Sequence, residues 1–404
     1  MCSAALSHVK AVEFCHTPAG SYCAKLIADV GAEMIKVEEP RRGDFSRRRG
    51  PFPGDKPHSE RSGLFLYLNT NKLGVTLDAS TATGNEILAK LCQDTDVLIE
   101  DNPPGKMEEL GLDYQTLRAL NPGLIMASVT PFGQTGSHKD FKAYGLNSYH
   151  AGGDAFVLQS SGLPLSLDEP PVAAGRFAGD FEAGTMAAVA VMAALYGRIF
   201  TGSGQHIDVS RQEALMYLNA NILAKYPNYK TIPSRSTQRY DYGGMMPCKD
   251  GYVVIQAVEE HLWQGLVEVM GSPEWAKEER FKDKFSRAAN QDELNRLLTE
   301  WLAEHTREEV AAKVREKGVP VGRVLTIEEI MNYKQYEARE FFTELEHPEA
   351  GKLKYPTASY FSTERMWSGR RAAPLLGEHN QVVYCEKLGY SKEDLVKMTQ
   401  AGII

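Results

Sequence analysis

Residues Val9–Glu39 read VKAVEFCHTPAGSYCAKLIADVGAEMIKVEE. Val9–Phe14 has the composition of a short strand, Ala19–Asp29 has the spacing of a helix that opens at Gly20, and Glu33–Glu38 is a second apolar strand. This order of strand, helix and strand predicts a β-α-β unit. The turn before the helix carries only one of the three glycines of a dinucleotide-binding fingerprint, which gives little support to a dinucleotide site.

Strands and helices continue to alternate beyond this unit. A strand is expected at Gly74–Leu77, a helix at Thr83–Gln93, and further strands at Val97–Ile99, Leu124–Val129 and His206–Val209. Because such alternation is typical of crossover connections, it predicts the α/β class, with a mostly parallel sheet and helices on both faces. The apolar helix expected at Met186–Leu195 should lie buried against this sheet.

The composition changes after a helix expected at Arg211–Lys225. Tyr226–Tyr242 is polar and contains two prolines, which is typical of a crossover linker, and it leads into Gly243–Gly244. A second, smaller unit follows, with strands at Gly251–Val258 and Val319–Leu325 and helices at Glu260–Met270, Gln291–Glu304 and Thr306–Lys317. A helical pair, Gln381–Leu388 and Ser391–Ala401, closes the chain.

The composition is that of an ordinary soluble globular protein. The chain has 404 residues, of which 43 % are hydrophobic and 24 % charged, and 45 basic against 53 acidic side chains give a net charge of −8. This balance favours neither nucleic acid nor an anionic membrane as a partner, so an anionic ligand must be held by local groups.

The cysteines and the chain start indicate a cytoplasmic protein without a structural metal. The six cysteines form no C-x-x-C pair and no Cys/His group at metal-ligand spacing, which suits a reducing compartment. Met1–Lys10 lacks the apolar core of a signal peptide, and Met186–Leu195 is about half as long as a membrane-spanning helix. We therefore expect no membrane partner.

A basic run lies between the second and third expected strands. Five arginines occupy nine positions, Arg41–Arg49, of an otherwise acidic protein. Guanidinium groups match phosphate oxygens, so the run suits a phosphorylated ligand. A solvated loop explains it equally well.

Asp180 is the candidate with the clearest chemistry. It follows Gly179 and precedes the apolar helix, at the end of the stretch Pro170–Thr185. A carboxylate at a helix start is kept ionised by free backbone N–H groups and by the helix dipole, and an ionised, partly dehydrated carboxylate can act as a nucleophile. The simpler interpretation is an N-cap, in which the side chain accepts a bond from the next turn.

The chain resembles the class III CoA-transferases, the family of formyl-CoA and carnitine CoA-transferases, over nearly its whole length. The resemblance starts with Ala19–Gly20, Leu26–Glu38 and Gly43–Asp44. Five more segments follow in the family's order: Asn69–Lys72 with Leu77–Asp78, Pro104–Gly105 through Leu110–Leu112, Asn121–Pro122 with Phe132–Gly136, Thr201–Gln205 with Asp208–Val209, and Ala373–His379.

This resemblance implies a fold and a reaction. Asp180 takes the place of the family's nucleophile in a G-D-x-x-x-G setting. It would carry a donor acyl group as an anhydride and CoA as a thioester, so that CoA moves from an acyl-CoA to a small carboxylic acid. The implied architecture is a large doubly wound domain (residues 1–225 and 326–404), a smaller α+β domain (226–325) and an interlocked homodimer.

Two alternatives stay open at this point. An α-methylacyl-CoA racemase or epimerase of the same superfamily uses a His-Asp pair after the F-G-Q-x-G loop, where this chain has Tyr144–Gly145, and tyrosine is a poor base at neutral pH. Tyr144 also resembles the transferases, although a core aromatic would explain it too. The second alternative is a non-catalytic CoA-binding protein, in which Asp180 only caps a helix.

The resemblance also implies contacts to CoA and to the reacting acyl group. Coenzyme A or acyl-CoA is a substrate, with no permanently bound cofactor. The candidates for CoA are Arg41, Leu77, Ser80, Asp101, Asn102 and Lys142, although Glu39, Glu109 and Asp101 depart from formyl-CoA transferase. Backbone amides of the His16–Gly20 loop and of the helix start are candidate oxyanion donors. His16, Pro18, Ala19 and Tyr144 are expected near the acyl group, with Gly243–Gly244 as a lid.

Overall fold

The computed structural model describes residues 4–157, 174–175, 177–232, 242–364, 367 and 369–404. The predicted linker residues 233–241 and the residues 170–173 and 176 of the Asp180 stretch therefore lie outside the described residues. The chain divides into two compact units. One contains Met1–Asp154, Ala173–Ala220 and Gln335–Ile404, and the other is formed mainly by Asn221–Lys334.

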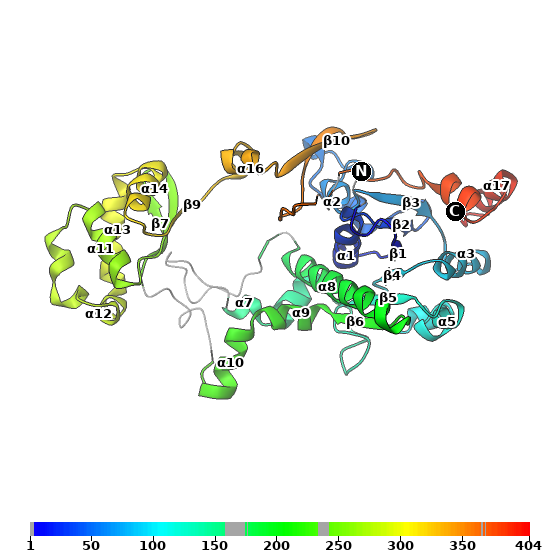
Figure 1. Ribbon diagram of the computed structural model, residues 1–404, viewed down its shortest axis with the longest axis horizontal. Coiled ribbons are helices and arrows are strands. Elements are labelled where there is room, and N and C mark those ends of the chain that lie inside the picture. Colours follow the sequence, from blue (N-terminus) through cyan, green and yellow to red (C-terminus); the bar gives the residue numbers. More distant parts are fainter. Residues whose placement is uncertain (1–3, 158–173, 176, 233–241, 365–366, 368) are drawn as a thin grey trace. The chain divides into compact units, whose positions relative to one another are not determined.

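A six-stranded parallel sheet forms the centre of the first unit (Figure 1), which confirms the predicted α/β class. Its order is β3-β2-β1-β4-β5-β6, and every neighbouring pair is parallel. The strands are β1 (Lys10–Phe14), β2 (Glu33–Glu38), β3 (Lys72–Thr76), β4 (Val97–Glu100), β5 (Ile125–Thr130) and β6 (His206–Ser210).

Helices cover both faces of this sheet. Successive strand residues point to opposite sides, and both sides carry apolar residues that must be buried. On one face Val97, Ile99 and Ile125 pack in a core with α1 (Pro18–Asp29) and α8 (Ala178–Thr201). On the other face Leu98 and Met126 pack with residues of the following helices: α3 (Ala82–Gln93), α5 (Tyr114–Leu120), the π-helical turn η5 (Gln381–Lys387) and α17 (Lys392–Gln400).

The helices α1 and α8 lie side by side (Figure 1) and approach each other closely. A Cβ on Gly184 would lie 2.6 Å from the carbonyl oxygen of Ala19, so only glycine allows this approach. The neighbouring contact residues Cys23, Ala183 and Ala187 are small and fully buried. The start of α1 is thereby held next to the first turns of α8.

A buried ionic cluster ties the first three strands together. Lys36 Nζ contacts carboxylate oxygens of Glu13 and Asp44 at 2.6 Å each, and Lys72 Nζ contacts Glu13 at 2.6 Å. Burial favours a higher pKa for Glu13, but Lys36 and Lys72 outweigh it and hold that pKa below its ordinary value. In the same region Arg47 is fully buried and its Nε lies 2.7 Å from Glu38.

Arg47 departs from both interpretations of the arginine run. Arg47 is part of the core, so it neither lies in a solvated loop nor faces a phosphate. Arg41, Arg42, Arg48 and Arg49 are exposed.

The shorter elements of the first unit complete the connections. They are α2 (Gly63–Leu68), α4 (Lys106–Glu109), α6 (Gly145–Ala151), α9 (Arg211–Leu218), α16 (Lys334–Ala338) and the antiparallel pair β10 (Phe342–His347) and β11 (Gly351–Pro356).

The second unit has an antiparallel sheet and its own core, as expected for an α+β fold. The sheet order is β7 (Gly244–Cys248), β8 (Gly251–Ile255), β9 (Val321–Arg323). Trp263, Phe281 and Leu298 belong to its core. Its helices are α7 (Asp154–Val157), α10 (Ala220–Tyr229), α11 (Glu260–Val269), α12 (Lys284–Ala289), α13 (Gln291–Ala303), α14 (Arg307–Glu316) and α15 (Ile327–Met331).

Two predicted helix bounds were wrong. The expected helix Arg211–Lys225 is divided between α9 and α10, and Tyr226–Tyr229 of the expected linker is helical. The apolar helix α8 has 24 residues, more than twice the expected Met186–Leu195. By length and composition alone it would reach across a membrane, a test that core helices of soluble proteins also pass, and one face of α8 packs against α1 and the sheet.

Candidate active site

The candidate residues of the first unit gather at one edge of the parallel sheet. His16 follows β1, Arg41 follows β2, Leu77 and Ser80 follow β3, and Asp101 and Asn102 follow β4. The segment with Lys142 and Tyr144 follows β5, and Asp180 starts the helix that leads back to β6. The carboxyl ends of parallel strands form the usual ligand-binding edge of α/β sheets.

Asp180 is the third residue of α8, not its N-cap. Phe177 takes the N-cap position with φ 60°, and no side-chain cap bond is made there. The interpretation of Asp180 as an N-cap is therefore wrong. The Asp180 side chain is buried, with a residue exposure of 1 %.

Arg211 is the partner that holds this buried carboxylate. Its Nη1 donates to Oδ1 of Asp180 at 2.6 Å, and its Nη2 donates to the carbonyl oxygen of Ala143 at 3.1 Å. Both charged side chains are almost fully buried. Arg211 is the first residue of α9, whose N-cap is Ser210 at the end of β6.

Burial raises the pKa of Asp180, and the Arg211 guanidinium opposes that shift without cancelling it. The sequence suggested that the helix start would keep the carboxylate ionised. Instead, removal from water is the larger effect, and the favourable charge comes from Arg211. A carboxylate can act as a nucleophile, and burial removes the water that would otherwise solvate its oxygens.

The second oxygen of Asp180 faces the start of α6. A Cβ on Gly145 would overlap Oδ2 of Asp180. Tyr144, the residue before it, is 71 % exposed, which rules out the core-aromatic interpretation. Its backbone N–H donates to Oδ1 of Asn147 at 3.0 Å. Gly145 thus adjoins Asp180, while the placement of Tyr144 near the acyl group stays a prediction.

Asp101 organises the loop between β1 and α1. Its carboxylate accepts the backbone N–H groups of His16 and Thr17 at 2.7 Å each. These two amides are therefore occupied, which contradicts their expected role as oxyanion donors. Pro18 and Ala19 are buried at the start of α1, where Ala19 lies against Gly184 of α8.

The other CoA candidates lie at the same edge in different surroundings. Leu77 is buried and its N–H donates to the carbonyl oxygen of Glu38 at 2.8 Å, while Ser80 donates twice to Oδ1 of Asp78. Asn102 is buried against Glu100. Arg41 and Lys142 are exposed, so among these candidates they are the cations that an anionic ligand can reach.

Gly243 and Gly244 belong to the second unit. Both have positive φ angles, 77° and 84°. The N–H of Gly243 donates to Oδ1 of Asn295 at 2.9 Å, and a Cβ there would lie 2.6 Å from the carbonyl oxygen of Ile255. The backbone conformation at the start of β7 is a sufficient reason for glycine at both positions. Their role as a lid stays a prediction.

A small polar cavity of about 30 Å³ lies on the face of the sheet that is opposite to α1 and α8. Glu100, Ser128 and His206 line it, and Ser128 Oγ lies 2.8 Å from His206 Nε2. Burial raises the pKa of Glu100 to about 7, against hydrogen bonds from Ser128 and Asn102 that favour the charged form. This cavity has room for about one water molecule.

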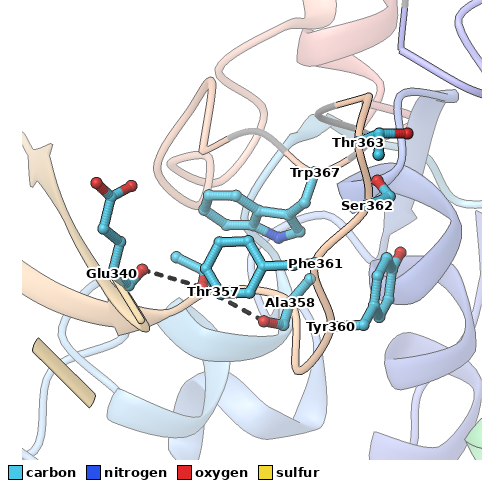
Figure 2. Close-up of a pocket in the computed structure, with 8 residues that line it drawn as sticks. All are labelled: Glu340, Thr357, Ala358, Tyr360, Phe361, Ser362, Thr363 and Trp367. Carbon is cyan, nitrogen blue, oxygen red and sulfur yellow. Dashed lines mark hydrogen bonds between the residues drawn. The ribbon is translucent and has the colours of Figure 1, made fainter. Parts of the chain in front are cut away.

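A larger cavity, about 240 Å³, lies beside the C-terminal strand pair (Figure 2). It is lined by aromatic and hydroxyl side chains together with one acid and one alanine: Glu340, Thr357, Ala358, Tyr360, Phe361, Ser362, Thr363 and Trp367. Thr357 Oγ1 donates within it to backbone carbonyl oxygens of Glu340 and Ala358. None of the predicted site residues lines this cavity.

Sequence reasoning missed Arg211 and the contact of Gly145 with Asp180. Arg211 did carry a signal, because a cation at the first position of a helix is disfavoured by the helix dipole unless an anion lies near it. Within the part of the chain that the structure describes, no group of three or more His, Cys, Asp or Glu residues is arranged to hold a metal ion.

Comparison with known proteins gives a consistent result. The sequence model of CoA-transferase family III matches residues 6–380. The chain is 32 % identical to the succinyl-CoA–D-citramalate CoA-transferase of Chloroflexus aurantiacus, over 99 % of this chain and 98 % of that protein. It is 31 % identical to the formyl-CoA:oxalate CoA-transferase of Streptomyces avermitilis, over 99 % of both chains.

A mammalian relative and a solved structure agree with this. The succinyl-CoA:glutarate CoA-transferase of Mus musculus is 28 % identical over 99 % of this chain and 90 % of that protein. The crystal structure of a CAIB/BAIF family protein from Brucella suis matches with a TM-score of 0.83 and 27 % identity, over 95 % of this chain and 100 % of that one.

Proposed function

Because the chain belongs to CoA-transferase family III and is a class III CoA-transferase, we propose that Asp180 is its nucleophile and that its acceptor is a small carboxylic acid. The observation that carries this proposal is the environment of the Asp180 carboxylate. It is buried at the ligand-binding edge of the sheet, with Oδ1 held by Arg211 and Oδ2 turned toward Gly145.

The reaction proceeds through acyl groups on Asp180. The carboxylate attacks the donor thioester, which forms an aspartyl anhydride and releases CoA thiolate. The thiolate then attacks the aspartyl carbonyl to give an aspartyl-CoA thioester and the donor acid. The acceptor carboxylate displaces CoA to form a second anhydride, and the returning thiolate converts this to the product acyl-CoA. Each intermediate needs a site that excludes water.

The acceptor is proposed to be a dicarboxylic acid. The named substrates of the relatives include succinyl-CoA, citramalate, oxalate and glutarate, all of which derive from acids with two carboxyl groups. Arg41 and Lys142 supply exposed positive charge at the same sheet edge for the phosphates of CoA. The enzyme needs no permanently bound cofactor for this chemistry.

We further propose a cytoplasmic homodimer. The outer face of α8 presents Tyr196, Ile199 and Phe200, which are 66 %, 75 % and 72 % exposed. A contiguous apolar face of this kind is typical of an interface between subunits. Two relatives from Chloroflexus aurantiacus are named as the alpha subunit and the beta subunit of a succinyl-CoA–L-malate CoA-transferase.

An exchange assay tests the function. Purified protein is incubated with succinyl-CoA, formyl-CoA or other acyl-CoA esters and a panel of mono- and dicarboxylic acids, and new acyl-CoA esters are measured by mass spectrometry. We expect exchange that Asp180→Asn lowers by about 10³-fold or more. Deuterium incorporation at the α-carbon without exchange would instead indicate the racemase, and binding of CoA without either reaction would indicate a binding protein.

A further inference from the structure

Arg211 is fixed by contacts on both sides of its guanidinium. Nη1 reaches Oδ1 of Asp180 at 2.6 Å, and Nη2 reaches the carbonyl oxygen of Ala143 at 3.1 Å. The residue is 3 % exposed. A buried planar donor with two anchors has little freedom to follow a moving partner, so the guanidinium marks a fixed position for Oδ1.

The two oxygens of the Asp180 carboxylate are therefore not equivalent. Oδ1 has the cationic donor, whereas Oδ2 lies against the Cα of Gly145 and, among the described residues, accepts no hydrogen bond. The oxygen without a donor keeps its electron pairs for attack. The oxygen with the donor is stabilised wherever negative charge collects on it.

Building on the proposed function, we propose that Arg211 is a catalytic residue that binds Oδ1 of Asp180 as the oxyanion of both tetrahedral intermediates at the aspartyl carbon, and that Oδ2 is the attacking oxygen. Preorganised donors at a developing oxyanion are the largest single source of rate in many enzymes. The sequence analysis placed such donors in the His16–Gly20 loop and at the helix start, and two amides of the loop are occupied by Asp101.

The bonds at Asp180 follow from this assignment. Oδ2 attacks the donor thioester carbon, and the carbon–sulfur bond breaks to release the thiolate. The thiolate sulfur then bonds to the aspartyl carbon Cγ, and the carbonyl electron pair moves to Oδ1 beside Arg211. When that pair returns, the bond between Cγ and Oδ2 breaks, and Oδ2 leaves as a carboxylate oxygen of the donor acid.

The acceptor reverses these steps. One oxygen of its carboxylate bonds to Cγ, charge again collects on Oδ1, and the carbon–sulfur bond to CoA breaks. The thiolate then takes the acceptor acyl group, and the electron pair of the broken bond stays on the oxygen that came from the acceptor. Each turnover thus replaces Oδ2 with an acceptor oxygen and leaves Oδ1 in place.

An isotope experiment on the native enzyme tests this. The protein catalyses many turnovers with an unlabelled acyl-CoA and an acceptor acid that carries ¹⁸O in both carboxylate oxygens. The mass of the peptide containing Asp180 is then measured by mass spectrometry. We expect one ¹⁸O atom in Asp180 however many turnovers occur. Two ¹⁸O atoms in Asp180 would overturn the proposal, since Oδ1 would then exchange places with Oδ2.

Three variants separate catalysis from structural support. Arg211→Gln is expected to lower kcat by about 10²- to 10³-fold and to allow the second ¹⁸O atom to enter Asp180. Arg211→Lys keeps a donor and should restore single labelling and part of the rate. Arg198→Gln removes another ion pair of the first unit, between Arg198 and Asp96 at 2.7 Å, and should leave the rate and the labelling unchanged.

The results also distinguish this inference from the proposed function. Transfer without any ¹⁸O in Asp180 would reject Asp180 as the nucleophile. Single labelling that persists in a folded Arg211→Gln protein of native rate would leave Asp180 as the nucleophile and reject the role of Arg211. Native folding of the variants is checked by circular dichroism and thermal unfolding.

Discussion

Oδ2 of Asp180 lies where a Cβ at Gly145 would have to be. Gly145 opens α6, and its φ angle is not among the positive ones, so the conformation of its backbone does not require glycine. The position of the Asp180 carboxylate requires glycine here. The first residue of α6 must therefore be glycine because of a side chain on α8, and that side chain is the proposed nucleophile.

Gly145→Ala is therefore expected to lower transfer activity much more than stability. The added methyl group must displace the Asp180 carboxylate from its position beside Arg211, whereas alanine itself suits a helix. We expect kcat to fall by about 10²-fold or more, because small displacements of a reacting group are costly. Steady-state kinetics and thermal unfolding measure the two effects, and native kcat in the variant would contradict this account of Oδ2.

Gly184→Ala tests the close approach of α1 and α8. Its Cβ would lie 2.6 Å from the carbonyl oxygen of Ala19, and the helices must move apart. Overpacking of this kind costs about 1–3 kcal/mol of unfolding free energy. Gly197→Ala is the matched control, because a Cβ at that position in α8 meets nothing within 4 Å. Urea unfolding should show a loss for Gly184→Ala and no loss for Gly197→Ala.

Glu100→Gln should change how stability depends on pH. The pKa of Glu100 is raised to about 7 in the fold, above its unfolded value, so the folded state keeps a proton that the unfolded state has lost. Its contribution to stability is present in acid and is lost as pH rises toward 7. The unfolding free energy of the glutamine variant minus that of the native protein should therefore increase from pH 5 to pH 8, by up to about 3 kcal/mol.

Unfolding free energies at the two pH values measure this difference. Parallel pH profiles for the native protein and the variant would show that Glu100 stays ionised in the fold. Ser128 and Asn102, which hydrogen-bond to Glu100, are left unchanged by the substitution.

Ile199→Glu tests the proposed subunit interface. Ile199 is 75 % exposed on the outer face of α8, so a charge there does not disturb the core of the subunit. If this face is covered by a second copy, the glutamate would be buried without a partner and the dimer should dissociate. Light scattering measures the mass. Leu120→Glu, at a 48 % exposed residue of α5 on the other side of the sheet, should leave it unchanged.

The sequence predicted the local elements well because their signals are local. The strands β1, β2 and β4 are short apolar runs between turns, and the first turn of α1 contains Pro18 and Gly20. The start of α8 was missed because its first turns contain Gly179, Asp180 and Gly184, which interrupt the apolar pattern that defines a helix core.

Contacts between distant segments could not be predicted in the same way. Asp180 and Arg211 are 31 residues apart, and the strand β6 lies between them. Arg47 looked like part of a solvated or phosphate-binding run, and only the fold shows that Glu38 neutralises it in the core. Charge pairing across elements depends on topology, which single-sequence patterns do not carry.

Covalent trapping on Asp180 tests the central claim most directly. The native protein is mixed with succinyl-CoA and with other acyl-CoA esters, treated with hydroxylamine or borohydride, digested and mapped by mass spectrometry. The account predicts a modified peptide that contains Asp180, and no such peptide from a folded Asp180→Asn variant. CoA transfer that proceeds without any adduct on Asp180, or with the adduct on another residue, would contradict it.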